Sequence, residues 1–201
     1  MPVNSRDDAK AKTRAKLLRS ATHVFAKRGF NKATVEEIAG RAGFTRGAFY
    51  ANFADKADAL LTVLEEQRAE DMSEIARLVA ATPDDRKLGA LQDWYVRVLG
   101  DQRLANATAE LTSRPALATT VRRRLAERQA QVRSSIATML AGYREEAGLT
   151  LPLDDEQIAS LILALGDGIA TQRHLEPDAV PDSAFTTAIA YLWFGLIADP
   201  A

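Results

Sequence analysis

The sequence predicts an all-α fold of about nine helices. Through most of the 201 residues, apolar side chains recur at the three- and four-residue spacing of amphipathic helices. No stretch shows the alternation of apolar and polar residues that is typical of a half-buried strand. Glycine and proline fall between the periodic segments, for example at Gly29, Gly43 and Pro83, where helices end or restart. With 47% hydrophobic residues, the composition is that of an ordinary globular protein with a sizeable core.

The first two helices follow from apolar spacing and from capping residues. Apolar residues four, seven and eight positions apart predict a helix over about 10–28 that stops at Gly29. Thr34 is a favourable N-cap residue, and Glu37, three positions later, has the spacing of a capping box. These signals place a second, short helix directly after Thr34.

The next connection predicts a helix-turn-helix. Gly43 permits the left-handed backbone of a tight turn, and Phe44 is an apolar residue that can fill the angle between two helices. Thr45 caps a third helix whose first residues are small, polar or basic, as a helix entering a major groove requires. Arg46 can donate two hydrogen bonds to guanine, and Gly47 lets the backbone approach a base edge.

The charge distribution separates the first 60 residues from the rest. They carry 12 Lys/Arg and 6 Asp/Glu, a balance of +6, whereas residues 61–201 have a balance of −7. This predicts that the N-terminal part meets a polyanion and that the rest does not, the alternative being chance clustering of solvated charges. Thr34, Tyr50 and Lys56 stand near helix starts or edges, where phosphate contacts are expected.

Six more helices are expected beyond the third. Asp55 can cap a long helix that runs to about residue 80. The last helix is apolar almost all round between Ala188 and Ala198, so it must be covered on more than one face. The other helices are expected at about 84–100, 102–113, 116–146, 154–174 and 183–198.

The sequence lacks the residues and motifs that several classes of protein function require. The chain has no cysteine, and its two histidines, His23 and His174, do not have the spacing of metal ligands. Neither a G-x-S-x-G elbow nor a phosphate-binding glycine loop is present. Adjacent carboxylates such as Glu36–Glu37 and Asp154–Asp155 point to different sides of a helix and are interpreted as helix caps. We therefore expect no enzyme, cofactor or metal and, without a signal-like or spanning segment, a cytoplasmic protein.

Residues 34–61, TVEEIAGRAGFTRGAFYANFADKADALL, and the preceding helix, KLLRSATHVFAKRGFNKAT, resemble the DNA-binding head of the tetracycline-repressor (TetR) family. The resemblance implies a head of three helices, an effector-binding body of about six, and dimerisation through the last two helices. We accordingly expect a helix-turn-helix DNA-binding domain over 1–54 and an effector-binding and dimerisation domain over 55–201.

The same resemblance assigns roles to residues of the head and shows two departures. Asn52 stands where the family commonly has a histidine, and Ala51 where it often has a larger polar or aromatic residue. Asn52 can still donate to a phosphate but Ala51 cannot. This leaves open a second class of function, a helical ligand-binding or scaffold protein whose head no longer binds DNA. The predicted DNA contacts are Thr34, Thr45, Arg46, Gly47, Tyr50, Asn52 and Lys56.

Two sites in the body are also implied. An effector cavity among the middle helices suits aromatic and methionine side chains, with plain core packing as the alternative for each. Its candidates are Trp94, Tyr95, Leu99, Leu104, Leu111, Met139 and Tyr143. The last two helices of two chains would form a four-helix bundle, the alternative being a hairpin buried within a monomer. The candidates there are Ile158, Leu161, Ile162, Leu165, Ile169, Ile189, Leu192, Trp193 and Leu196.

The function expected from these features is that of a ligand-responsive, DNA-binding transcriptional regulator. A two-fold dimer presents paired recognition helices to half-sites about one DNA turn, or a small multiple, apart. We therefore expect a repressor that is released from an inverted-repeat operator when a small, largely apolar effector binds the C-terminal body. Its partners would be double-stranded operator DNA, the effector and a second copy of the chain, with no membrane.

Overall fold

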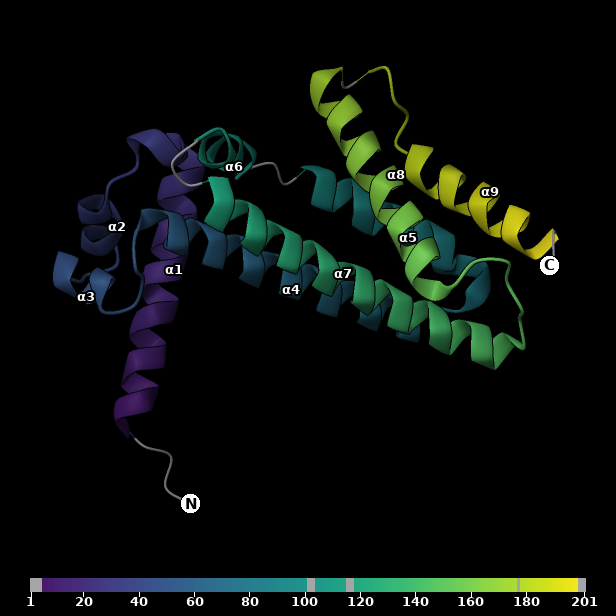
Figure 1. The fold of residues 1–201 in the computed structure, drawn as a ribbon, viewed down its shortest axis with the longest axis horizontal. Helices are drawn as coiled ribbons and strands as arrows, with labels where there is room; N and C mark the ends of the chain where they lie inside the picture. The colour runs from purple at the N-terminus through teal and green to yellow at the C-terminus, as the bar shows by residue number, and fades with distance from the viewer. Residues whose placement is uncertain (1–4, 101–103, 115–117, 177, 199–201) are drawn as a thin grey trace. The chain divides into compact units, whose positions relative to one another are not determined.

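The structure, a computed structural model, describes residues 5–100, 104–114, 118–176 and 178–198. Within these ranges all regular structure is helical, which confirms the predicted all-α class (Figure 1). The nine helices of the described residues are α1 Ser5–Lys32, α2 Val35–Arg41, α3 Arg46–Tyr50, α4 Lys56–Ala81, α5 Asp84–Gly100, α6 Ala105–Thr112, α7 Ala118–Ala147, α8 Asp155–Leu175 and α9 Ala184–Ala198.

The first helix differs most from its prediction. It begins at Ser5 and not near residue 10, and helical backbone resumes after Gly29 and continues to Lys32. Gly29 itself is not helical, with φ 72° and ψ 179°, a conformation that is essentially restricted to glycine. The predicted stop is therefore a break within α1, after which one further turn leads into the connection to α2.

The helices form two compact units, and the division between them falls within α4 and within α7. The first unit contains α1–α3, the start of α4, α6 and the start of α7. The second contains the end of α4, α5, the rest of α7, α8 and α9. The unit that holds the helix-turn-helix thus includes one stretch from far along the chain, which contains α6 and the start of α7, and α6 packs against α1.

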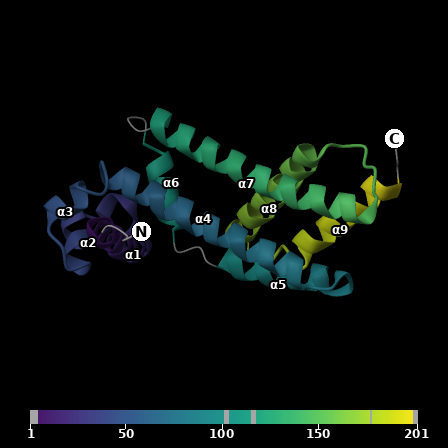
Figure 2. The same ribbon diagram turned by 90° about the horizontal axis from the view of Figure 1, so that it is seen from below.

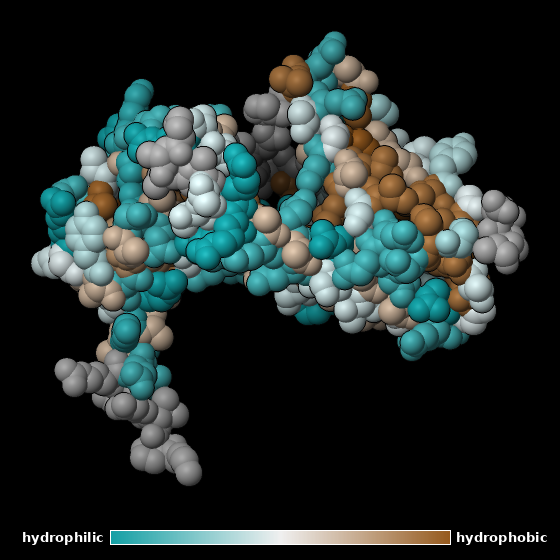
Figure 3. All heavy atoms as spheres, viewed as in Figure 1, coloured by the Kyte–Doolittle hydropathy of each residue, from teal (hydrophilic) through white to brown (hydrophobic). Residues whose placement is uncertain are grey.

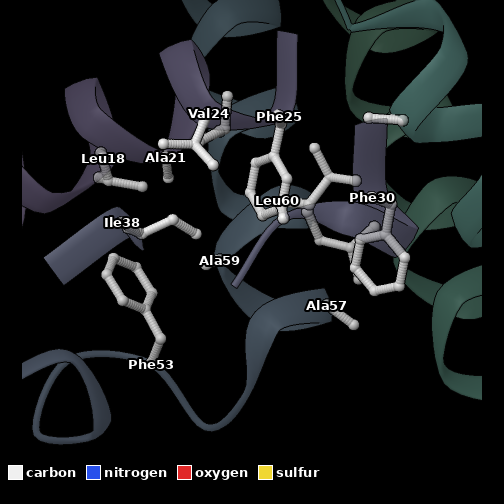
Figure 4. Packing of buried hydrophobic residues seen from close by; sticks show 14 of the residues in the cluster. Leu18, Ala21, Val24, Phe25, Phe30, Ile38, Phe53, Ala57, Ala59 and Leu60 are labelled. Atoms are coloured by element: carbon white, nitrogen blue, oxygen red, sulfur yellow. The ribbon is translucent and has the colours of Figure 1, made fainter. Parts of the chain in front are cut away.

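The core of the first unit is apolar and dense. Phe25 of α1, Ile38 of α2 and Leu60 of α4 are fully buried, and Figure 4 shows side chains from these three helices converging. Each buried side chain of this size contributes about 1.5–3 kcal/mol relative to an exposed one. Seen from below in Figure 2, α2 and α3 lie beside α1. This core is the platform on which the short helices α2 and α3 rest.

In the second unit, Tyr95 joins three helices. Its ring stacks on Phe185 of α9 with centroids 3.9 Å apart, and its hydroxyl donates to the carbonyl of Gly166 in α8 at 2.7 Å. Burial raises the pKa of Tyr95 to about 12. Among the residues that the structure describes, none of the helices is both long enough and apolar enough to span a bilayer.

Candidate DNA-binding site

The turn between α2 and α3 is a Schellman motif. The N–H of Gly43 donates to the carbonyl of Gly40 at 3.0 Å, and the N–H of Phe44 donates to that of Ala39 at 2.9 Å. This pair of bonds requires left-handed backbone at Gly43, whose φ is 79°. Phe44 packs half-buried against the core of the head. The prediction that Gly43 makes the turn and Phe44 fills it is confirmed.

Threonine hydroxyls cap both short helices. The Oγ1 of Thr34 accepts from the N–H of Glu37 at 3.1 Å, and the Oγ1 of Thr45 accepts from the N–H of Ala48 at 3.3 Å. The predicted capping box is only half present, because the Glu37 carboxylate accepts from Arg28 Nε of α1 at 3.3 Å. Both helix starts are nevertheless held in place by their own N-cap residues.

The recognition helix α3 packs against the rest of the head through the face that carries Phe49. Phe49 is fully buried, so the opposite face of the helix turns outward. Arg14 of α1 donates to the carbonyl oxygen of Asn52 at 2.7 Å, and its guanidinium lies 4.6 Å from the Phe53 ring centroid. Sequence reasoning missed this role of Arg14, because its position along α1 resembles that of the solvated basic residues around it.

The outward face of α3 carries the residues predicted to read DNA. The Nη1 of Arg46 lies 2.8 Å from Oε1 of Glu36, and its Nη2 lies 3.4 Å from the hydroxyl of Tyr50. Tyr50 is 45% exposed, although it is a large aromatic residue. The Tyr50 hydroxyl first, and then the Glu36 carboxylate, raise the pKa of Arg46. The guanidinium of Arg46, the ring of Tyr50 and the carboxylate of Glu36 therefore contact one another on a surface that is exposed to solvent.

Internal packing does not demand glycine at position 47. A Cβ built on Gly47 would meet Thr45 Oγ1 at 3.7 Å, an ordinary contact. Its backbone is instead exposed at the first turn of α3, where a missing side chain allows a close approach. A DNA contact by Gly47 stays a prediction.

Asn52 and Lys56 are engaged within the head. The Nδ2 of Asn52 donates to the carbonyl of Ala48 at 2.8 Å. The Nζ of Lys56 donates to the carbonyls of Phe30 at 2.6 Å and Ala33 at 2.8 Å, with that of Asn31 at 3.5 Å. Burial lowers the pKa of Lys56. A phosphate contact by Lys56 stays a prediction, and it would require the ammonium to leave carbonyls at the end of α1.

Two of the residues predicted for the effector cavity lie in the core of the first unit. Leu104 and Leu111 are buried there together with residues of α1, and their role in binding an effector stays a prediction. The helical spacing of α6 correctly predicted an apolar face but could not show which helix covers it. The side chain of Leu99 lies outside the described residues.

The remaining cavity candidates lie in the second unit. Trp94 and Tyr95 are buried, and Met139 and Tyr143 are half-buried. The ring of Tyr143 meets that of Trp193 edge-on, with centroids 5.5 Å apart. These aromatic and methionine side chains are thus collected in one unit, and their role in binding an effector stays a prediction.

Two of the predicted dimer contacts are covered by their own chain. Ile158 is fully buried and Leu196 is 6% exposed, so neither is available to a second copy. Leu161, by contrast, is one of the exposed large apolar residues of the protein. The half-buried candidates are Ile162, Leu165, Ile169, Ile189, Leu192 and Trp193.

The apolar side chains exposed on α9 were not among the predicted contacts. Tyr191 is 76% exposed, Phe194 is 67% exposed and Ile197 is 39% exposed. Figure 3 shows apolar surface gathered over α8 and α9. The signal in the sequence was the all-round apolar character of the last helix, which indicates a second covered face but not which residues form it.

The capped helices, the Schellman turn and the outward face of α3 define a helix-turn-helix DNA-binding protein. The comparisons with known proteins agree. A family model described as "Bacterial regulatory proteins, tetR family" matches residues 17–63, and one described as "BetI-type transcriptional repressor, C-terminal" matches residues 83–192. The chain belongs to the tetR family of DNA-binding transcriptional regulators.

Relatives cover most of the chain. The HTH-type transcriptional regulator TtgR of Pseudomonas putida is 29% identical over 175 residues, which are 84% of this chain and 83% of that protein. The HTH-type transcriptional repressor Rv1474c of Mycobacterium tuberculosis is 32% identical over 146 residues, 68% of this chain and 77% of that protein. The crystal structure of FadR from Bacillus subtilis in complex with stearoyl-CoA has the same fold, with a TM-score of 0.68 and 18% sequence identity. The match covers 91% of this chain and 97% of that chain.

Proposed function

We propose that the protein is a homodimeric repressor that binds an inverted-repeat operator and is released when a small, largely apolar effector binds its body. The observation that carries the proposal is the exposed pair of Arg46 and Tyr50 on a helix whose other face is anchored by Phe49. A bidentate arginine–guanine contact of the kind that Arg46 can make discriminates between bases by about 1–3 kcal/mol.

The contacts that fix the position of α3 support sequence-specific binding to DNA and not only electrostatic attraction to phosphates. Its start is capped by Thr45, its end is held by Arg14, and the preceding turn is fixed by the Schellman motif at Gly43. A rigid mount keeps a side chain in the narrow range of positions from which it can hydrogen-bond to a base edge. We propose DNA contacts by Thr34, Thr45, Arg46, Gly47 and Tyr50.

The proposal of a homodimer is supported by the exposed apolar side chains of α8 and α9. Large apolar residues such as Tyr191 and Phe194 are seldom left in water as a contiguous group unless they meet a partner. A second copy offers the same group to the same surface in a two-fold arrangement. It would also supply the second recognition helix that an inverted repeat requires.

An effector in the body is supported by composition and by structural neighbours. Trp94, Tyr95 and Met139 provide the apolar side chains that line most ligand sites. FadR of Bacillus subtilis was solved with stearoyl-CoA and a further neighbour, SmeT, with triclosan. We propose that residues 55–201 hold the effector and the dimer contacts and that residues 1–54 hold the DNA contacts.

Release would follow from a shift between two states of the dimer. In one state the two heads match successive major grooves, and in the other they do not; an effector that prefers the second state lowers operator affinity. A coupling of about 1–3 kcal/mol, typical of such linkage, changes the affinity roughly 5- to 150-fold. Because α4 and α7 each continue from the first unit into the second, we propose these helices as the connection. The protein would act in the cytoplasm, by binding and without catalysis.

The proposal is tested with operator DNA selected from genomic fragments. We expect the wild-type dimer to bind a selected fragment far more tightly than a scrambled duplex, and Arg46→Ala to abolish the difference. Arg28→Ala is the matched control, since Arg28 is an exposed arginine of the head that pairs with Glu37 away from α3. Unchanged binding after one half-site is scrambled would contradict the inverted-repeat operator.

A further inference from the structure

Glu36 lies beside Arg46, the arginine that is proposed to contact a base. It lies in the first turn of α2, but the capping of that turn is done by Thr34. Its side chain is 60% exposed, and its Oε1 lies 2.8 Å from Nη1 of Arg46, whose side chain is 63% exposed. Exposed ion pairs of this kind contribute little to stability, so the fold does not depend on this pair.

The guanidinium of Arg46 is held from two sides. The carboxylate of Glu36, on α2, contacts Nη1 of Arg46. The hydroxyl of Tyr50, one turn further along α3, accepts from Nη2, and the Tyr50 ring centroid lies 5.4 Å from Arg46 Cζ. A guanidinium has five N–H donors, and these two contacts use only part of them. The arginine is therefore oriented in the free head and keeps donors for a base.

The charge of Glu36 also affects binding that does not depend on sequence. Binding of this kind rests on lysine and arginine side chains that neutralise phosphates. If Arg46 turned to a phosphate, it would leave the Glu36 carboxylate uncompensated next to a polyanion. A guanine edge presents two neutral acceptors, which Arg46 can use while it keeps its partner.

We propose that Glu36 is a positioning residue that determines specificity: it holds Arg46 for a base edge and withholds it from phosphates on other DNA. The proposal rests on the proposed function, because it presupposes that α3 reads an operator. It adds a residue of α2 to the reading surface and an inhibitory action on non-specific binding, which a surface of basic residues alone would not provide.

Glu37 supplies a matched control. It lies next to Glu36 on α2 and carries the same charge, but its carboxylate pairs with Arg28 of α1 at 3.3 Å. Glu36→Gln and Glu37→Gln therefore change the net charge equally, and only the first loosens Arg46. The affinities of both variants are measured for a selected operator and for a scrambled duplex of equal length, over a range of salt concentrations. Thermal unfolding verifies that both remain folded.

We expect Glu36→Gln to strengthen binding to scrambled DNA and to lower the ratio of specific to non-specific affinity about 3- to 10-fold. Its salt dependence on scrambled DNA should steepen by about one ion, as one more phosphate is neutralised. Glu37→Gln should change both affinities by a similar factor and leave the ratio within about twofold. In an Arg46→Ala background, Glu36→Gln should leave the ratio unchanged.

Equal ratios for Glu36→Gln and Glu37→Gln would overturn the proposal, and so would an unchanged affinity of Glu36→Gln for scrambled DNA. If the wild-type protein binds both duplexes equally, the proposed function itself is wrong and the role of Glu36 with it. A wild-type protein that discriminates, with a Glu36→Gln variant that discriminates equally well, would contradict the role of Glu36 alone.

Discussion

Replacement of Gly29 by alanine is expected to destabilise the head severely. Gly29 has φ 72° and ψ 179°, where an L side chain is strained. An ideal Cβ would also lie 2.8 Å from Oε1 and 3.0 Å from Oε2 of Glu110 on α6. That carboxylate accepts a hydrogen bond from the backbone N–H of Asn31 at 2.7 Å. The substitution therefore strains α1 and displaces the residue that joins α1 to α6.

The magnitude follows from these two contributions. Backbone strain of this type costs about 1–3 kcal/mol. Loss of a hydrogen bond to a charged acceptor adds about 1.5–3 kcal/mol. Gly29→Ala should thus lower the free energy of unfolding by roughly 2.5–6 kcal/mol. Gly43→Ala is the comparison: its φ is 79°, but no atom lies within 4 Å of the added Cβ, so only the left-handed backbone penalty of about 1–2 kcal/mol applies.

Urea unfolding of the full chain, followed by far-UV circular dichroism, measures these values. The double variant Gly29→Ala/Glu110→Ala separates the two contributions, because alanine at position 110 leaves no carboxylate to displace. In that background the alanine at position 29 should cost only the backbone strain. A Gly29→Ala variant that loses no more stability than Gly43→Ala, or that loses the same amount with and without Glu110, would contradict this prediction.

Three further predictions concern polar contacts of the two units. Lys56→Met removes the donor to carbonyls at the end of α1 and should lower the free energy of unfolding by about 1–3 kcal/mol in urea; an unchanged value would mean that water replaces the ammonium at no cost. Arg124 of α7 pairs with Asp58 at 2.6 Å and with Glu65 at 2.7 Å, both on α4. Arg124→Met should therefore lower the free energy of unfolding by roughly 1–3 kcal/mol. The control Arg123→Met removes an exposed charge one residue away and should leave that free energy almost unchanged. Because burial raises the pKa of Tyr95 to about 12, its stabilising contribution is full below the ordinary value of about 10 and is lost as the pH rises towards 12. Unfolding titrations at pH 9, 10 and 11 should therefore show a decline that is smaller in Tyr95→Phe, and equal declines would contradict it.

The features that sequence analysis predicted correctly depend on residues close together in the chain. Gly43 and Phe44 form their turn with carbonyls of the preceding helical turn. The carboxylate of Asp55 accepts from the N–H of Asp58 at 2.8 Å, three residues on, as expected for a cap of α4. Asp154 likewise forms a full capping box at the start of α8. Such local hydrogen bonds can be predicted from residue type and spacing alone.

The features that it missed depend on how distant segments pack. Leu111 has the spacing of an apolar helix face wherever that face is buried, and only the structure shows that it lies under α1. Glu37 has the spacing of a capping box, but Arg28 of another helix competes for its carboxylate. Glu36 and Arg46 are ten residues apart on two helices, and their pairing follows from the angle of the turn between them. Spacing along the chain does not report such geometry.

We propose that the outward face of α3 reads a specific DNA sequence. The most direct test is fluorescence anisotropy with duplexes selected from genomic fragments, titrated at several salt concentrations, for the wild-type protein and for Arg46→Ala/Tyr50→Ala. We expect tight, sequence-dependent binding by the wild type and, in the variant, only weak binding that is equal for all sequences and salt-sensitive. Sequence-dependent binding that survives in the double variant would contradict it, and so would selection that yields no preferred sequence for the wild type.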